Sequence, residues 1–240
     1  MRYFCILLFL ITFSVSASAQ NYKTGSWGVV TITLPGDSLH KWGGYSEFQV
    51  RTNTAAFTGF QYYEYKAGVS YDLDRNSTAL IGTGRYTTYD YADLSEGPTV
   101  AETRLWEQFT NNQYLGRIKL EHRYRIEQRW LTNEYRNRFR YRLNVTVPVT
   151  RSKMLPKTFF IGVFDEVFFN NRSPNFERNR FFGSLGYQFN NSWSVQAGIL
   201  NQNNVNLGPG NDKNNLMINL FYKILRQNHN STSVTASTID

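Results

Sequence analysis

The clearest pattern in the chain is an alternation of charged and uncharged residues with a period of two, in residues 117–129 and again in residues 134–145. In the first segment the charged positions are Arg117, Lys119, Glu121, Arg123, Arg125, Glu127 and Arg129. In the second segment they are Glu134, Arg136, Arg138, Arg140 and Arg142. Most positions between them are apolar or aromatic, such as Ile126 and Phe139. A period of two predicts extended strands with two unlike faces, so these neighbouring strands are predicted to share one charged wall.

The unlike faces of these two strands indicate their surroundings. A soluble β-sandwich with an aromatic core would not need charged faces on consecutive strands, because the inner faces of its sheets pack together. A transmembrane β-barrel does need two unlike faces, since alternate residues contact lipid and a watery lumen. The aromatic content of 16% agrees with this interpretation, because Tyr, Trp and Phe gather at both membrane interfaces. We therefore predict a barrel with apolar residues outside and charged residues inside.

Segments with strand periodicity recur along the chain, separated by clusters of Gly, Asn, Asp and Pro that favour turns. We expect strands at about residues 26–34, 41–51, 60–72, 77–89, 100–111, 114–130, 134–149, 158–169, 178–189, 192–202 and 214–225. These segments number eleven, whereas bacterial single-chain barrels have an even number of strands. The predicted fold is therefore all-β, an antiparallel transmembrane β-barrel of ten to twelve strands, with twelve preferred.

The connections between these strands are of two kinds. Tight turns are predicted at residues 74–76, 111–113 and 190–191. Longer polar connections are predicted at residues 90–99, 171–177 and 203–213. In outer-membrane barrels the short turns face the periplasm and the longer loops face outward, so the two kinds are expected at opposite ends of the barrel.

The N-terminal segment has the composition of an export signal. Arg2 is followed by an apolar run and then by the small residues of Ala17-Ser18-Ala19, a pattern typical of a cleavable signal peptide. The sole cysteine, Cys5, lies inside this segment, so the exported chain would contain no disulfide. We predict three regions: a signal peptide at residues 1–19, an outer-membrane β-barrel at residues 20–225 and a polar C-terminal tail at residues 226–240. The predicted location is the cell outer membrane of a Gram-negative bacterium.

The polar faces of the predicted strands supply a set of charged residues that would face the lumen. The candidates are Arg51, Glu64, Arg85, Glu102, Arg104, Arg117, Lys119, Glu121, Arg123, Arg125, Glu127, Arg129, Arg136, Arg138, Arg140, Arg142, Glu166 and Arg180. Opposite charges occur on facing walls, so we expect an Arg/Glu network across the interior. Such a network either braces the barrel and conducts nothing, or lines a narrow pore whose excess of arginine favours anions.

Composition and motifs argue against several other functions. The formal net charge is +8 at pH 7, but residues 117–142 hold nearly all of the excess, so no nucleic-acid partner is expected. The histidines His40, His122 and His229 do not cluster, and none has a serine in a recognisable nucleophile and base arrangement. We predict no enzymatic activity, catalytic residue, metal site or cofactor. His122 is expected to be an interfacial side chain beside Tyr124.

Several short motifs, taken in order, carry a family resemblance. They are Trp27, Arg51, Gly84-Arg85-Tyr86, Glu102-x-Arg104-x-Trp106-x-Gln108, Glu127-Gln128-Arg129-Trp130, Arg138-Phe139-Arg140-Tyr141-Arg142, Asp165-Glu166 and Asn179-Arg180. The chain resembles, over essentially all of the predicted mature protein, the exported outer-membrane β-barrels classified as the domain of unknown function 2490. One departure is Ile199, where an aromatic residue is expected. The resemblance implies a barrel in the outer membrane and implies no activity, because that family has no assigned function.

These observations predict an outer-membrane barrel in contact with membrane lipid. Its role is expected to be structural, or that of a narrow, porin-like passage that favours small anionic solutes. The main alternative is a surface protein that presents its longer loops for binding or adhesion. A lipid-modifying barrel enzyme is a further alternative, although no catalytic motif supports it.

Overall fold

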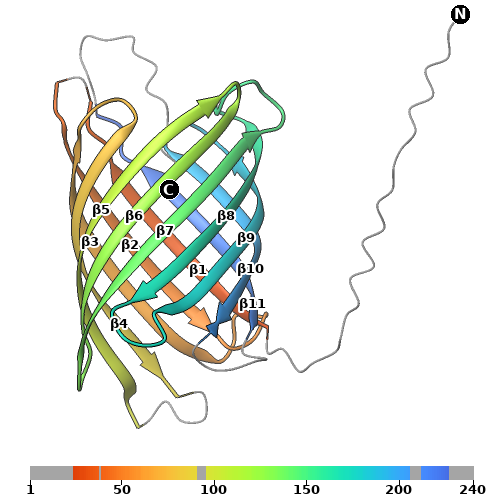
Figure 1. The fold of residues 1–240 in the computed structure, drawn as a ribbon. Coiled ribbons are helices and arrows are strands. Elements are labelled where there is room, and N and C mark those ends of the chain that lie inside the picture. The colour runs from red at the N-terminus through yellow and green to blue at the C-terminus, as the bar shows by residue number, and fades with distance from the viewer. Residues whose placement is uncertain (1–23, 38, 91–95, 206–211, 227–240) are drawn as a thin grey trace, which may run out of the picture.

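The strands of the computed structural model close into a barrel (Figure 1). The structure describes residues 24–37, 39–90, 96–205 and 212–226, and the predicted signal peptide and nearly all of the predicted tail lie outside them. The strands are β1 (Gly25–Leu34), β2 (Trp42–Thr52), β3 (Phe60–Asp72), β4 (Ser77–Tyr89), β5 (Pro98–Leu115), β6 (Ile118–Trp130), β7 (Tyr135–Pro148), β8 (Thr158–Asn170), β9 (Phe176–Gln188), β10 (Trp193–Asn204) and β11 (Lys213–Lys223). Within the described ranges, no helix has the length and apolar character that crossing a membrane requires. Each predicted segment corresponds to one of these strands, so the predicted all-β barrel is confirmed.

The barrel closes through a parallel pair of strands. β1 and β11 run in the same direction, from the pair Gly25 and Asn215 to the pair Thr33 and Lys223. The other neighbouring strands are antiparallel. When eleven strands alternate in direction, the first and the last point the same way and can meet only in parallel. The preference for twelve strands with antiparallel pairing throughout is therefore wrong for the described residues, because a parallel pair closes the sheet without a twelfth strand.

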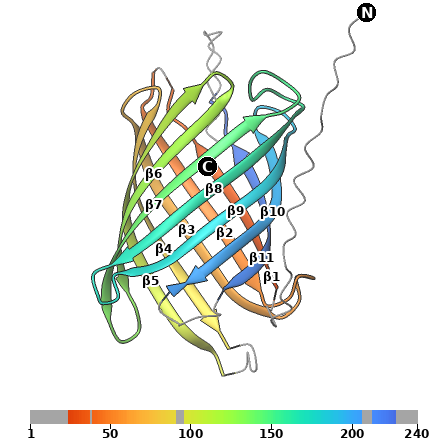
Figure 2. The same ribbon diagram turned by 45° about the vertical axis from the view of Figure 1, so that its right-hand side comes forward.

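The strands are steeply tilted to the barrel axis (Figures 1 and 2). A path that steps from paired residue to paired residue, beginning at Tyr135 of β7 and crossing each strand in turn, returns to β7 beside Val149. This shift of about 14 residues per circuit is the shear of the barrel, which together with the strand number sets its tilt and diameter. Eight strands leave an interior just filled by side chains, so eleven strands leave a lumen of modest width.

The two rims of the barrel carry different connections. We call the rim at which β1 begins the N-rim, and the rim at which β11 ends the C-rim. The connections at the C-rim are residues 35–41, 73–76, 116–117, 149–157 and 189–192, and those at the N-rim are residues 53–59, 90–97, 131–134, 171–175 and 205–212. The predicted longer connections thus share the N-rim, although parts of two of them lie outside the described residues. Residues 35–41 and 149–157 depart from the expected division, because they are longer connections at the C-rim.

The turn between β5 and β6 lies further along the chain than predicted. β5 continues through Asn112, which pairs with Glu121, and the chain reverses at Gly116 and Arg117. Gly116 has a φ of 60°, a left-handed conformation that glycine adopts without steric cost. Two-residue hairpin loops commonly need a residue of this kind. The predicted tight turn at residues 111–113 is therefore wrong, because those residues belong to the strand.

The other predicted tight turns are present at the C-rim, and side chains hold them. Asp74 Oδ1 accepts hydrogen bonds from the backbone N–H groups of Asn76 (2.7 Å) and Ser77 (2.8 Å). Asn190 Oδ1 accepts hydrogen bonds from the N–H groups of the two residues that end its turn, each at 2.8 Å. Capture of nearby backbone donors explains why Asp and Asn favour turns. The hydrogen bond from the Asn76 N–H also lowers the pKa of Asp74 below its ordinary value.

The outer wall is apolar between two groups of aromatic contacts. Towards the N-rim the contacts are Phe60–Tyr63, Tyr63–Tyr89, Trp130–Tyr135 and Phe169–Phe176. Towards the C-rim they are Trp42–Tyr71, Phe159–Tyr187, Tyr187–Phe189 and Trp193–Tyr222. Exposed aliphatic side chains, including Ile81, Ile199 and Ile218, lie between the two groups. The alternation along each strand thus separates an apolar outer face from a polar inner face.

Candidate functional site

The register of β6 and β7 brings like charges together on the wall of the lumen. The opposed pairs are Arg123 with Arg142, Arg125 with Arg140, and Arg129 with Arg136. Like charges directly opposite one another destabilise a strand pair. Carboxylates must therefore lie among these arginines for the wall to be stable.

Glu127 is the carboxylate at the centre of this wall, and it is completely buried. Arg138 donates to its Oε2 from Nη2 (2.6 Å) and Nε (2.9 Å), and Arg140 donates to its Oε1 from Nη1 (2.5 Å). Arg104 Nη1 lies 3.8 Å from Glu127 Oε2, and Arg125 Nη1 lies 3.7 Å from Glu127 Oε1. Four arginines thus converge on one carboxylate through charge-assisted contacts, which offset the repulsion between β6 and β7.

Glu102 ties β5 to the same wall. It accepts two hydrogen bonds from Arg104 (2.6 and 2.7 Å) and two from Arg129 (2.5 and 3.1 Å). The guanidinium of Arg104 also lies over the ring of Tyr86, with its Cζ 3.6 Å from the ring centroid. Bidentate pairing and stacking both restrict a guanidinium to one orientation, so Arg104 is held rigidly.

Two further glutamates complete the braced part of the network. Glu166 on β8 accepts hydrogen bonds at Oε1 from Arg123 (2.6 Å) and from Arg140 (2.8 and 3.1 Å). Glu121 on β6 accepts a hydrogen bond from Lys119 at 3.1 Å. Because all of these side chains are mostly buried, each carboxylate replaces water as the partner of its cations.

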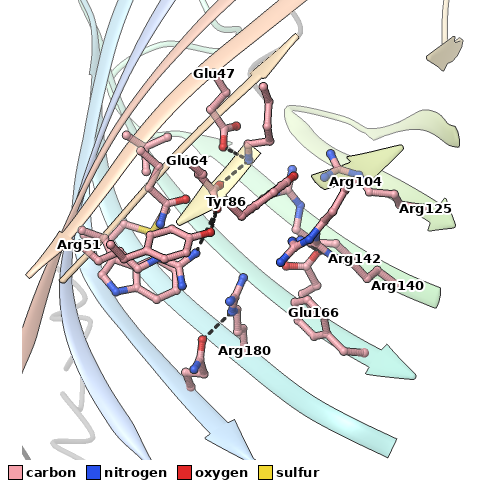
Figure 3. A pocket seen from close by; sticks show the side chains of 18 of the residues that line it. Glu47, Arg51, Glu64, Tyr86, Arg104, Arg125, Arg140, Arg142, Glu166 and Arg180 are labelled. Carbon is pink, nitrogen blue, oxygen red and sulfur yellow. Dashed lines mark hydrogen bonds and ion pairs between the residues drawn. The ribbon is translucent and has the colours of Figure 1, made fainter. Parts of the chain in front are cut away.

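A smaller charged group lies on β2 and β3. Lys66 forms ion pairs with Glu47 and with Glu64, the latter at 2.6 Å between Nζ and Oε1. Glu64 also accepts a hydrogen bond from the Tyr62 hydroxyl, and Arg51 Nη2 lies 3.5 Å from it. Figure 3 shows Glu64 lying between Glu47 and Arg51. Glu64 therefore contacts Lys66, Tyr62 and Arg51, and its contact with Arg51 is the longest of the three.

These side chains surround a cavity of about 350 Å³ inside the barrel (Figure 3). Of the predicted lumen residues, the cavity is lined by Arg51, Glu64, Glu102, Arg104, Arg123, Arg125, Arg129, Arg138, Arg140, Arg142, Glu166 and Arg180. Counted over the described part of the chain, eleven Lys and Arg side chains line it, against four Glu side chains. Glu121, Glu127 and Glu177, which do not line the cavity, pair with some of these cations, so eleven cations face seven carboxylates in all. Fixed charges of one sign in a narrow space reinforce one another, so this excess favours negative charge in the cavity.

Four predicted residues belong to the network without lining this cavity. Lys119, Glu121 and Glu127 are buried on the inner face of β6, outside the lining of the cavity. Arg136 lies where β7 begins at the N-rim and forms an ion pair with Glu134. They contribute to the packing of the charged interior rather than to the surface of the cavity.

Two predicted lumen residues lie elsewhere. Arg117 is exposed in the turn after β5, because that turn comes later in the chain than expected. Arg85 lies on the outer face of β4, where its Nη1 donates to Thr103 Oγ1 at 3.0 Å. The inner face of β4 carries Gly84, which is buried against Lys66. A glycine has no side chain to reveal its face, so the sequence pattern did not identify the inner face of this strand.

Glu177 is a carboxylate of the network that the sequence pattern did not identify. The register of β8 and β9 shifts so that Phe169 pairs with Phe176 while Phe168 pairs with Arg178. The extra residue, Glu177, is buried, and its Oε1 accepts a hydrogen bond from Arg138 at 3.1 Å. A bulge of this kind breaks strict alternation, so no period-two pattern could have placed Glu177.

Apolar side chains also occupy the lumen. Trp27, Phe182 and Leu200 form a buried cluster inside the barrel, with Phe164 and Met217 packed against it. These residues come from strands on the side where the barrel closes, so apolar side chains fill part of the lumen. The cavity is therefore bounded by charged residues on one side and by an apolar cluster on the other.

His122 lies on the outer face of β6, as predicted. Its Nδ1 is 2.9 Å from the hydroxyl of Tyr141, and the ring of Tyr141 contacts that of Tyr124 with centroids 5.0 Å apart. The side chain is thus part of an aromatic patch on the outer wall rather than of the charged interior.

Comparison with known proteins identifies one match. A family model described as "Protein of unknown function (DUF2490)" matches residues 24–214. No curated protein and no solved structure matches the chain. The matched residues run from the start of β1 into the first residues of β11, so they contain most of the lumen described above.

Proposed function

The chain belongs to the DUF2490 family of proteins of unknown function, and we propose that it is a Gram-negative outer-membrane barrel whose lumen is a narrow passage for small anions. The outer wall supports the membrane location, because an apolar band between two aromatic groups is the pattern that lipid requires. The signal peptide predicted from the sequence supports export.

One observation carries the preference for anions: the eleven-to-four excess of cationic over carboxylate side chains on the cavity wall, counted over the described residues. Rings of fixed positive charge attract anions and repel cations, and a narrow lumen with low-dielectric walls strengthens the effect. The proposal gives these residues no catalytic role. Its partners are membrane lipid and small anionic solutes.

A braced scaffold that conducts nothing is the second candidate. Glu102, Glu127 and Glu166 are buried and saturated with arginine, and the cluster around Phe182 fills part of the lumen. Both features favour a rigid interior. The two candidates differ in whether ions cross the barrel.

Planar-bilayer recording of the full-length protein under a potassium chloride gradient tests the proposal. We expect single-channel current steps whose reversal potential is shifted towards the equilibrium potential of chloride. Arg125→Gln removes one cation from the cavity wall and should move the reversal potential towards cations, whereas Arg117→Gln removes the same charge from an exposed turn and should leave it unchanged. Cation preference in the unaltered protein would contradict the proposal. Heat-modifiable migration on a gel identifies folded protein. If folded protein never conducts, the passage is excluded and the braced scaffold is supported.

A further inference from the structure

Three arginines on the cavity wall make only distant contacts with carboxylates or none. Arg51 Nη2 lies 3.5 Å from Glu64 Oε2, and Arg178 Nη2 lies 3.8 Å from Glu177 Oε1. Arg178 and Arg180 project from β9, and Arg51 projects from β2. Among the described residues, no carboxylate oxygen lies within 4.0 Å of the Arg180 guanidinium, and its Nε donates instead to the neutral Gln202 Oε1 at 2.8 Å. A neutral amide satisfies one donor and leaves the charge uncompensated.

Arg178 is less satisfied still. Its Nε is buried and has no hydrogen-bond partner in the described part of the protein. The nearest carboxylate oxygen belongs to Glu177, at 3.8 Å, and Glu177 already accepts a hydrogen bond from Arg138. A buried donor without an acceptor costs free energy, so this guanidinium is poised to take one.

Aromatic rings hold two of these groups in place without using their N–H edges. The Cζ atoms of Arg51 and Arg180 lie 3.9 and 4.9 Å from the ring centroid of Trp27. Arg51 also lies over Tyr62, at 4.0 Å, and Arg180 lies over Phe168, at 4.9 Å. Stacking orients a planar guanidinium without using its N–H donors. In Arg51 two of these donors also face the Gln49 amide, and one of them faces Glu64. Figure 3 shows the side chains of Arg51 and Arg180 reaching into the same cavity.

We propose that Arg51, Arg178 and Arg180 form a binding site for a small oxyanion, a carboxylate or a phosphate, within the lumen. Such a group accepts several hydrogen bonds at once in the forked geometry that guanidinium offers. Arg178 and Arg180 share the ring of Phe168, at 5.8 and 4.9 Å, as Arg51 and Arg180 share that of Trp27, so the anion would also reduce the mutual repulsion of these cations. The cavity volume of about 350 Å³ lies towards the lower end of the range for small-molecule sites, so the solute is a small one.

This inference rests on the proposed anion-favouring lumen and adds saturable binding at a defined place. Calorimetric titration of the folded, full-length protein in detergent, at constant ionic strength with chloride as the background anion, tests it. The probes are inorganic phosphate and, separately, acetate. We expect saturable binding of at least one probe, and the preferred probe distinguishes a phosphate site from a carboxylate site.

Matched variants locate the site. Arg178→Gln and Arg180→Gln should each weaken binding by about tenfold, because each removes charge-assisted hydrogen bonds. Arg180→Lys should weaken binding less, since lysine keeps the charge but loses the fork. Arg125→Gln removes a cation elsewhere on the cavity wall and should have a smaller effect than either, while Arg117→Gln should have none.

The outcomes separate the two proposals. Equal losses from Arg125→Gln and Arg180→Gln would mean that general lumen charge, not this site, holds the anion, and would overturn the inference. Absence of saturable binding for both probes would also overturn it, even if recordings show anion preference. Saturable binding that Arg180→Gln weakens, in a barrel that never conducts, would uphold the site and overturn the passage.

Discussion

Arginines on the two sides of the lumen have opposite surroundings. On β6 and β7, Arg138 and Arg140 donate to the fully buried Glu127. On β9, Arg178 and Arg180 have no comparable carboxylate among the described residues and lie against aromatic rings. Abundance of arginine alone therefore does not indicate a role, because a saturated guanidinium braces the wall while an unsaturated one is available to a ligand.

The largest effect is expected from breaking the braced side. Glu127→Gln removes the charge on which Arg138 and Arg140 converge, and it leaves buried cations without compensation. We expect the free energy of unfolding to fall by about 3–5 kcal/mol, measured by urea denaturation of the refolded protein in lipid vesicles. Glu96→Gln makes the same change on an exposed residue at the N-rim and should stay within about 0.5 kcal/mol. Equal effects of the two variants would show that Glu127 does not brace the wall.

Removing an arginine is expected to change the free energy of unfolding by a smaller amount, with opposite sign on β9 and on β7. Arg178→Met removes a buried donor without a partner and should raise the free energy of unfolding by about 1 kcal/mol. Arg138→Met removes a partner of Glu127 and should lower it by about 3 kcal/mol, because a buried carboxylate loses its main donor. The same denaturation assay measures both variants. A loss of stability in Arg178→Met would mean that β9 is braced like β7.

The smallest effect lies outside the lumen and provides a reference for it. Hydrogen bonding to the Asn76 N–H lowers the pKa of Asp74 below the ordinary value of 3.8, so the folded state favours the ionised carboxylate. This contribution to stability is present above that ordinary value and is lost as the pH falls through the lower folded pKa. Asp74→Ala should therefore destabilise the protein slightly at pH 7, and the difference should shrink on acidification. The test compares unfolding midpoints of the two proteins at several pH values, and a difference that grows towards low pH would contradict it.

Local pattern was sufficient to predict the strands and most of their faces. In β3, β8 and β11 the apolar positions alternate over many residues, and a strand that slipped by one residue would expose its polar face to the apolar side. The structure accordingly has Tyr65, Phe159 and Ile218 on the outer wall. Most of the predicted lumen residues line the cavity for the same reason.

Prediction from periodicity was wrong where the backbone departs from strict alternation or where a glycine has no side chain to indicate a face. Because Gly84 has no side chain, the inner face of β4 was not identified, and Arg85 was predicted to face the lumen although it lies on the outer wall. The late turn at Gly116 moved Arg117 from the strand into solvent. The bulge at Glu177 added a carboxylate to the network that no alternation predicts. These features depend on backbone geometry at single residues, to which a periodicity is insensitive.

Side-chain direction alternates along any strand, so periodicity was enough to predict two charged strands side by side on the wall of a β-barrel with an apolar exterior. How the barrel closes and which arginines have partners could not be read from periodicity. Both depend on residues far apart in the chain: β1 pairs with β11 in parallel, Glu166 accepts a hydrogen bond from Arg123, and the Trp27 ring contacts both Arg51 and Arg180. Strand periodicity specifies a face, whereas shear and strand number specify which faces meet across the lumen.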